Sequence, residues 1–201
     1  MAARHQGDLR AELLEAGHGL LAESGHETIS IRQLAQRAGV SSGAPYYHFA
    51  DRRALLLALA LDGFERLNGR AKEILSANVG DPAASIAALS RGFIDFNNNN
   101  PRLVDLMYQS ELTRPVDPAL RSSFLQAYET VVSTLALVHP GVSRPDLLAR
   151  AVAFWTSLFG LSRLIRDDLL APFSEKPMAE WENALVAEIS ASALRSFAVA
   201  G

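Results

Sequence analysis

The chain has 201 residues, of which 49% are hydrophobic and 20% are charged, and its formal net charge is −3. This is enough apolar material for one or two packed cores, and the absence of cysteine excludes disulfides, thiolate catalysis and cysteine-ligated zinc. The N-terminus lacks the apolar segment of a signal peptide, and no strongly apolar run approaches the roughly 18 residues of a membrane helix. We therefore expect a cytoplasmic protein without membrane attachment.

The chain begins with a predicted amphipathic helix. Asp8 is placed to cap it, Leu9 and Leu13 open an apolar stripe at helical spacing, and Gly25 follows its last turn. We expect this helix to support the two short helices that come next.

The first short helix has start and stop signals at both ends. Ser30 and Gln33 have the spacing of a capping box, and Ile29 and Leu34 have the spacing of a hydrophobic staple. Gly39 is suited to the left-handed conformation that closes a helix. These signals predict a helix over about residues 30–38.

The second short helix is predicted to extend to about Phe49, and it is unusually polar. Ser41 or Ser42 can cap it. Pro45 lacks an N–H and is tolerated only in a first turn, so either Ser42 is the cap or the first turn is distorted. A short rod of small and hydrogen-bonding residues suits a DNA major groove, which is about 12 Å wide.

A third helix is predicted to begin at Asp51, with Arg52 and Arg53 in its first turn. Cations oppose the helix dipole at this end, and an anionic partner would offset that cost. Residues 28–53 hold four arginines and one aspartate, a net charge of +3 within an acidic chain. Such a local positive charge predicts contact with phosphates of double-stranded DNA. A helix-turn-helix that only packs within the protein is the alternative.

These residues resemble the N-terminal DNA-binding domain of TetR-type transcriptional regulators. The shared motif runs from Thr28 through Leu34-Ala35, Ala38-Gly39-Val40-Ser41 and Gly43 to Tyr46-x-His48-Phe49, with a basic residue at Arg52. The resemblance implies that Ser41 caps the recognition helix. It also implies that Ser42, Gly43, Ala44, Tyr46 and Tyr47 face the operator and that Thr28, Tyr46, His48 and Arg52 contact its phosphates. Arg32, one of the four arginines of the segment, is a further candidate for contact with DNA. Ala44-Pro45 departs from the Thr-Leu that is frequent in the family.

The remainder of the chain is predicted to be helical, without strand alternation or repeats. The expected helices cover about residues 51–76, 82–100, 101–112, 118–138, 145–169 and 178–198. Gly63 and Gly69 lie within the first of these and predict a bend or a close helix crossing. We therefore expect an all-α protein of about nine helices, with a DNA-binding domain at 1–53 and an effector-binding and dimerisation domain at 54–201.

The last two helices carry more apolar surface than one packed face requires. This favours a homodimer formed through the helices near 145–169 and 178–198, as a four-helix bundle across a two-fold axis. An intramolecular core is the alternative. The resemblance likewise implies a dimeric repressor with an effector pocket in each subunit.

Aromatic and methionine side chains in the second domain are the candidates for lining that pocket. A weaker resemblance to a family subgroup supports this, since Trp155 to Gly160 matches a Trp-x-x-x-His-Gly motif with Phe159 in place of the histidine. We expect a small, mainly apolar effector, with Tyr128 and Asn97 able to orient a polar group. The candidate residues are Phe93, Phe96, Met107, Tyr108, Phe124, Tyr128, Trp155 and Phe159.

Two other functions are alternatives to a regulator. An enzyme is disfavoured because the sequence has no nucleophile elbow, phosphate loop or metal-ligand cluster, and we expect neither a cofactor nor a metal. The second alternative is a helical ligand-binding or interaction protein without sequence-specific DNA binding. Activation instead of repression also stays open, because the sequence does not fix where an operator lies.

Overall fold

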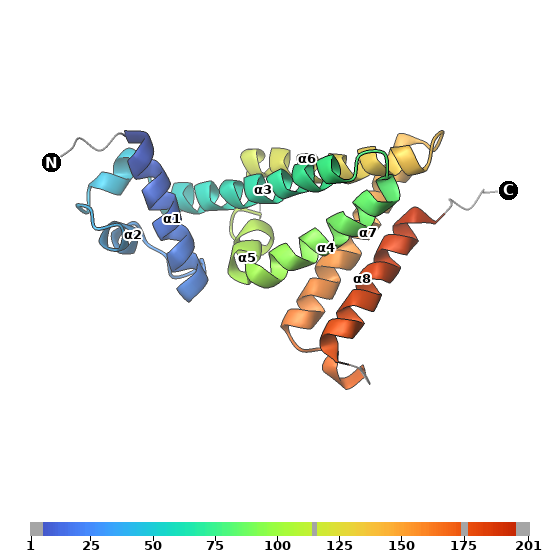
Figure 1. The fold of residues 1–201 in the computed structure, drawn as a ribbon. Coiled ribbons are helices and arrows are strands. Elements are labelled where there is room, and N and C mark those ends of the chain that lie inside the picture. The colour runs from blue at the N-terminus through green and yellow to red at the C-terminus, as the bar shows by residue number, and fades with distance from the viewer. Residues whose placement is uncertain (1–5, 114–115, 174–176, 196–201) are drawn as a thin grey trace. The chain divides into compact units, whose positions relative to one another are not determined.

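The computed structural model describes residues 6–113, 116–173 and 177–195, which form eight α-helices and two short 3-10 helices without a β-strand (Figure 1). The predicted all-α fold is confirmed. The structure has eight α-helices in place of about nine, because the second predicted short helix, the one extending to about Phe49, is a 3-10 turn. The helices are α1 (Gln6–Ser24), α2 (Ile31–Arg37), η1 (Ala44–Tyr47), α3 (Arg52–Ala77), α4 (Pro82–Asn99), α5 (Pro101–Gln109), α6 (Pro118–Val138), α7 (Arg144–Arg166), η2 (Ala171–Phe173) and α8 (Met178–Leu194).

The chain forms two compact units. Unit 1 comprises residues 1–66 and 100–123, and unit 2 comprises residues 67–99 and 124–201. Helix α3 is continuous and contributes its first part to unit 1 and its last part to unit 2. The functional boundary after residue 53 stays a prediction, since it concerns where DNA binding resides and not how the chain packs.

Local capping explains how the helices of unit 1 begin and end. The capping box is present at α2, where the Gln33 amide donates to the Ser30 hydroxyl and the Ser30 amide donates to Gln33. Asp51 accepts a hydrogen bond from the Ala54 amide at 2.7 Å and so caps α3. One prediction is wrong: α1 already includes residues 6 and 7, so Asp8 lies inside this helix and is not its cap.

The two glycines of α3 have different surroundings. A Cβ on Gly63 would lie 2.7 Å from Sδ of Met107 and 3.0 Å from Cδ1 of Leu103, both on α5. A Cβ on Gly69 would meet no atom within 4 Å. The predicted close crossing is therefore found at Gly63, within unit 1, and not at Gly69.

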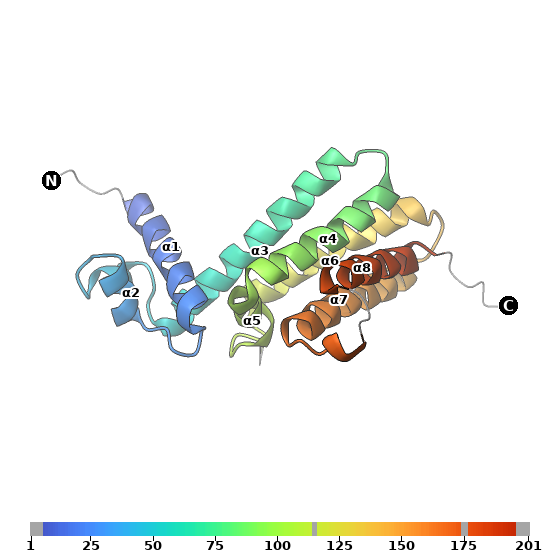
Figure 2. The same cartoon turned by 60° about the horizontal axis from the view of Figure 1, so that its bottom comes forward.

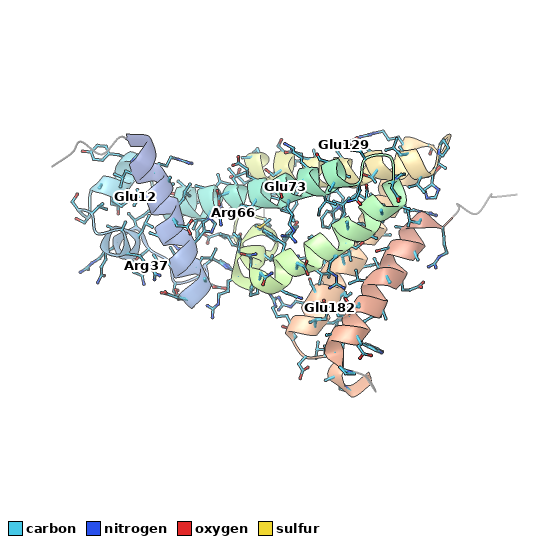
Figure 3. The ribbon with its side chains drawn as sticks, in the orientation of Figure 1. Glu12, Arg37, Arg66, Glu73, Glu129 and Glu182 are labelled. Carbon is cyan, nitrogen blue, oxygen red and sulfur yellow. The ribbon has the colours of Figure 1, made fainter. Side chains whose placement is uncertain are left out.

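In unit 2, helices α4, α7 and α8 pack side by side (Figures 1 and 2). Their contact includes small buried hydroxyls: Ser190 donates to Ser90 at 2.7 Å across α4 and α8. Glu182 of α8, labelled in Figure 3, forms an ion pair with Arg91 of α4. Small side chains allow helices to approach closely, and the hydrogen bond satisfies two buried polar groups.

Helix α7 is apolar on two sides. One side is buried against α4 and α8, whereas Leu148 and Val152, one turn apart on another side, are 44% and 43% exposed. It has 23 residues, and an 18-residue window within it has a mean hydropathy of 1.2, so that it is long and apolar enough to cross a membrane by length and composition alone. A second apolar side on a packed helix accounts for the same composition. For α8, residues 196–198 of the predicted helix lie outside the described residues.

Candidate nucleic-acid interface and internal cavity

The recognition segment is a single 3-10 turn. η1 spans Ala44–Tyr47, its N-cap position is Gly43, and no side chain caps it. The expectation that Ser41 or Ser42 caps this segment is therefore wrong, and the distorted first turn is what the structure contains. Pro45 explains the result, because it has no N–H for an α-helical bond and its buried ring fixes the backbone at the second position of the turn.

This turn presents two tyrosines to solvent. The Tyr47 side chain is 88% exposed and that of Tyr46 is 57% exposed, whereas neighbouring Phe49 is 2% exposed and belongs to the core. Ser42 and Gly43 are exposed beside them, as are Thr28 and Arg32, while Ala44 and His48 are half-buried. Two adjacent exposed aromatic side chains form a contiguous patch, which is the character of a contact surface.

Arg52 lies half-buried in unit 1 and holds the loop before α2. Its guanidinium donates to the carbonyl oxygens of His26 at 2.7 Å and Ile29 at 2.9 Å. It also pairs with Glu111 at 2.7 Å. The predicted phosphate contact stays a prediction, and these intramolecular partners give Arg52 a structural role that the sequence did not indicate.

A second polar cluster joins α1 to α3 within unit 1. Nε2 of His18 lies 2.6 Å from Oδ2 of Asp62, and Nε of Arg66 donates to the same oxygen at 2.6 Å. Burial lowers the pKa of His18, and the Arg66 charge lowers it further, although Asp62 acts in the opposite direction. The imidazole is thus favoured in its neutral form at this helix contact.

The positive charge of Arg37 on α2 is partly neutralised by an acidic neighbour. It forms an exposed ion pair with Glu23 of α1 at 2.5 Å (Figure 3), and hydrogen bonding from this arginine lowers the pKa of the glutamate. The local charge of +3 counted along residues 28–53 is therefore reduced by acidic side chains from other segments. Glu111, against Arg52, is another such side chain.

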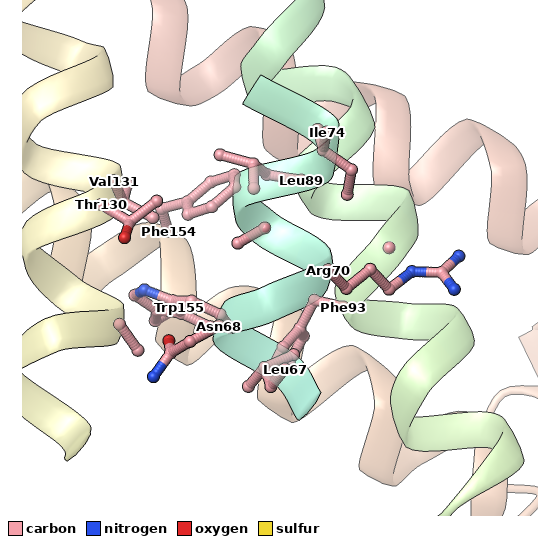
Figure 4. Close-up of a pocket in the computed structure, with 13 residues that line it drawn as sticks. Leu67, Asn68, Arg70, Ile74, Leu89, Phe93, Thr130, Val131, Phe154 and Trp155 are labelled. Atoms are coloured by element: carbon pink, nitrogen blue, oxygen red, sulfur yellow. The ribbon is translucent and has the colours of Figure 1, made fainter. Parts of the chain in front are cut away.

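Unit 2 contains a small, partly open cavity of about 20 Å3 between α3, α4, α6 and α7 (Figure 4). We call it the inner cavity. It is lined mainly by apolar side chains, among them Leu67, Phe93 and Trp155. A volume of this size holds about one water molecule, so the inner cavity is too small for an effector in this conformation.

Trp155 dominates the inner cavity. Its ring packs edge-on against Phe93 at 4.3 Å between centroids and lies 6.2 Å from the Tyr128 ring. Within the described residues, its Nε1 is the buried side-chain nitrogen that lacks a hydrogen-bond partner. In Figure 4 the indole lies between α3 and α6, beside Asn68. A buried donor without an acceptor is uncommon and marks a place where a water or a ligand oxygen would fit.

The predicted pocket residues divide into groups. Phe93 and Trp155 line the inner cavity, and Tyr128 contacts Trp155. Met107 and Tyr108 instead pack in unit 1, where the Tyr108 ring contacts Phe64 at 5.4 Å between centroids. The other three do not line the inner cavity: Phe96, Phe124 and Phe159.

Several lining residues were not predicted from the sequence. They include Asn68, Arg70 and Thr130, on α3 and α6. The spacing of the α3 residues could have indicated a helix face directed toward the core of unit 2. Polar side chains on a long helix, however, are usually assigned to the solvent-exposed face. No group of three or more potential metal ligands occurs among the described residues.

Comparison with known proteins places these features in a family context. Residues 13–59 match the family model "Bacterial regulatory proteins, tetR family", and residues 86–187 match "Tetracyclin repressor-like, C-terminal domain". The two matches together cover the recognition segment and most of unit 2.

Individual relatives have similar descriptions. The chain is 29% identical over 119 residues to the transcriptional repressor AcnR of Corynebacterium glutamicum, covering 58% of this chain and 56% of that protein. It is 36% identical over 92 residues to the transcriptional regulator BetI of Yersinia pestis, covering 45% of this chain and 46% of BetI. The matches thus span about half the length of these curated relatives. A protein of unknown function from Rhodococcus sp. RHA1 superposes with a TM-score of 0.75 at 28% identity, over 97% of this chain and 98% of the other.

Proposed function

Because the chain belongs to the TetR family of bacterial regulatory proteins, we propose that it is a DNA-binding transcriptional regulator, and specifically a ligand-responsive homodimeric repressor of a palindromic operator. The observation that carries the proposal is the exposed Tyr46–Tyr47 pair on the turn that follows α2. Aromatic and hydroxyl groups can contact base edges and phosphates, and a short turn fits the major groove.

Within this proposal, the nine predicted DNA-contacting residues have two kinds of role. Tyr47, which is 88% exposed, is the candidate for reading bases, and Tyr46 and Ser42 flank it. Thr28 and Arg32 are exposed nearby and are candidates for phosphate contact. Phosphate contacts supply affinity and base contacts supply selectivity, so substitutions in the two groups are expected to have different effects.

The proposed dimer forms through α7 and α8. Leu148 and Val152 lie one turn apart on the same face of α7 and are exposed, and Ala184, Ala187 and Ala191 are exposed on α8. An apolar stripe beside a face of alanines suits a four-helix contact between two copies. A single short recognition turn contacts few bases, and two turns held about 34–36 Å apart by a dimer provide selectivity.

The proposed regulation uses the continuity of α3. Its residues 67–74 line the inner cavity, and its first turn is held to the loop before α2 by Arg52. A ligand that displaces the last part of α3 therefore moves the first part, and Arg52 carries the loop and α2 with it. The resulting change in DNA affinity is limited by the ligand's preference for one arrangement over the other. The site of action is the cytoplasm.

The test is selection of bound fragments from a genomic DNA pool by the purified protein. An enriched palindrome whose binding weakens steeply with salt is expected. Tyr47→Ala should change the enriched sequence, whereas His48→Ala should weaken binding to all sequences alike. Failure to enrich any sequence at low salt, with and without added ligands, would contradict the proposal and favour a helical ligand-binding protein.

The dimer is tested separately by sedimentation. The protein without DNA is expected to have twice the chain mass at micromolar concentration, and Val152→Arg is expected to yield monomers. Val79→Arg is the matched control, because Val79 is 85% exposed but lies after α3, away from α7 and α8 in the sequence. A monomeric mass for the unmodified chain would refute the dimer.

A further inference from the structure

A second, larger cavity lies in the same gap of unit 2 as the inner cavity. It has a volume of about 540 Å3, is open to solvent, and is lined by the end of α3, the start of α4 and residues 126–137 of α6. We call it the outer groove. The volume lies within the range of about 300–1,000 Å3 that small-molecule sites occupy.

The two cavities are neighbours that share a lining residue, and on α6 the outer groove, at residues 126–137, runs alongside the inner cavity, at residues 127–131. On α3 the inner cavity is lined up to Ile74, and the outer groove begins at Leu75. On antiparallel α4 the order is reversed, with the inner cavity at residues 89–93 and the outer groove at 82–85. Thr130 of α6 lines both and lies where they meet.

The inner cavity is mainly apolar, whereas the outer groove combines the apolar side chains of Leu75, Val79 and Leu137 with polar side chains, among them that of Glu129. At the inner end, the buried Nε1 of Trp155 is a donor without an acceptor. At the outer end, Val79 and Leu137 are 85% and 73% exposed, and the hydroxyl of Ser133 lies beside them. Large apolar side chains exposed around an open groove mark an entry for an apolar molecule.

Charge restricts what can occupy the inner end. Arg70 lines the inner cavity but its guanidinium points away from Trp155 (Figure 4) and pairs with Asp95 at 3.5 Å. An anionic group beside Trp155 would thus be buried without a cation directed at it, which is unfavourable. A neutral acceptor such as a carbonyl oxygen satisfies the indole N–H without that cost.

We propose that the outer groove and the inner cavity form one binding track for an elongated, neutral, apolar molecule whose leading carbonyl or ether oxygen accepts a hydrogen bond from Trp155 Nε1. The inference rests on the proposed function and deepens it by naming the chemical class of the effector. The molecule enters between Val79 and Leu137, passes Thr130 and opens the inner cavity by displacing α3.

Calorimetric titration of the full chain without DNA tests the track, using 2-nonanone as the neutral probe and nonanoate at pH 8 as the anionic probe of equal length. 2-Nonanone is expected to bind saturably, and nonanoate about tenfold or more weakly. Trp155→Phe, which keeps an aromatic ring but loses the N–H, should lower the affinity for the ketone by about three- to tenfold. Trp181→Phe on α8 is the control and should leave the affinity unchanged.

A second pair of variants tests entry through the outer groove. Ser133→Trp fills the groove and should abolish ketone binding, whereas Ala136→Trp, also exposed on α6 but outside the groove lining, should not. In the Trp181→Phe chain, Trp155 is the sole tryptophan, and its emission should change on ketone addition.

Three results would overturn the proposal: no saturable ketone binding, equal affinity for nonanoate, or equal effects of Ser133→Trp and Ala136→Trp. If the Trp155→Phe chain fails to fold, the nonanoate comparison and the pair of groove variants still test the track. Because no DNA is present, failure here leaves the proposed operator binding untouched, and failure of the DNA selection leaves these titrations valid.

Discussion

Replacing Arg52 with alanine should destabilise the protein before it affects DNA directly. The guanidinium is bound to the carbonyl oxygens of His26, Glu27 and Ile29 and to the Glu111 carboxylate. The Arg52 side chain is 34% exposed, so its bonds are partly screened by water. Hydrogen bonds from a charged donor contribute about 1.5–3 kcal/mol, and an exposed ion pair contributes about 0–1 kcal/mol.

Allowing for this exposure, we expect Arg52→Ala to lower the free energy of unfolding by about 2 kcal/mol. In a chain of this size that corresponds to a fall of about 4–8 °C in Tm. Arg53→Ala is the matched control: its contacts to the Glu111 carbonyl and to Asp117 are 3.5 and 3.3 Å long, and its side chain is 48% exposed. This change should cost about 0.5 kcal/mol or less.

Arg52→Lys separates the structural role from a phosphate contact. Lysine keeps the positive charge but lacks the planar fork of donors that reaches several carbonyl oxygens at once. Thermal and urea denaturation followed by circular dichroism should therefore show that Arg52→Lys lowers the free energy of unfolding by nearly as much as Arg52→Ala. Unchanged stability of both variants, with DNA affinity lost only in the alanine variant, would refute the structural role and support the phosphate contact.

Three further outcomes are expected from the structure. Gly63→Ala should cost about 1–3 kcal/mol because the new methyl group collides with Met107, whereas Gly69→Ala in the same helix should stabilise by about 0.5–1 kcal/mol; urea denaturation compares them, and equal effects would contradict the close crossing. Tyr47→Ala should change stability by less than about 0.5 kcal/mol while altering sequence preference, and a large fall in Tm would show that the tyrosine packs. The pKa of His18 is lower in the folded protein than in the unfolded chain, so the stabilisation linked to its neutral form is present above about pH 6.5 and is lost as the pH falls through the folded pKa. His18→Gln should therefore flatten this part of the curve of unfolding free energy against pH. An unaltered slope would contradict the role assigned to His18.

Most helix boundaries in this protein can be predicted from local sequence signals. Ser30, Gln33, Gly39 and Asp51 act on backbone groups within a few residues of themselves, so their patterns can be recognised without knowledge of packing. The same holds for the two-sided apolar pattern of α7, because periodicity along a helix is a local property. The family resemblance was also contained in a local motif, at residues 28–52.

Which side chains meet is a property of the tertiary structure. Arg52 pairs with Glu111, 59 positions later in the chain, and no spacing rule connects two such residues. Met107 was a candidate for the pocket by residue type, yet it packs against Gly63 in the other unit. Nε1 of Trp155 lacks a hydrogen-bond partner because of how four helices pack around it. The sequence shows that a tryptophan can donate a hydrogen bond, but not whether an acceptor lies within reach. Contacts between distant segments depend on how loops close and cores pack, and this information is spread over the whole chain.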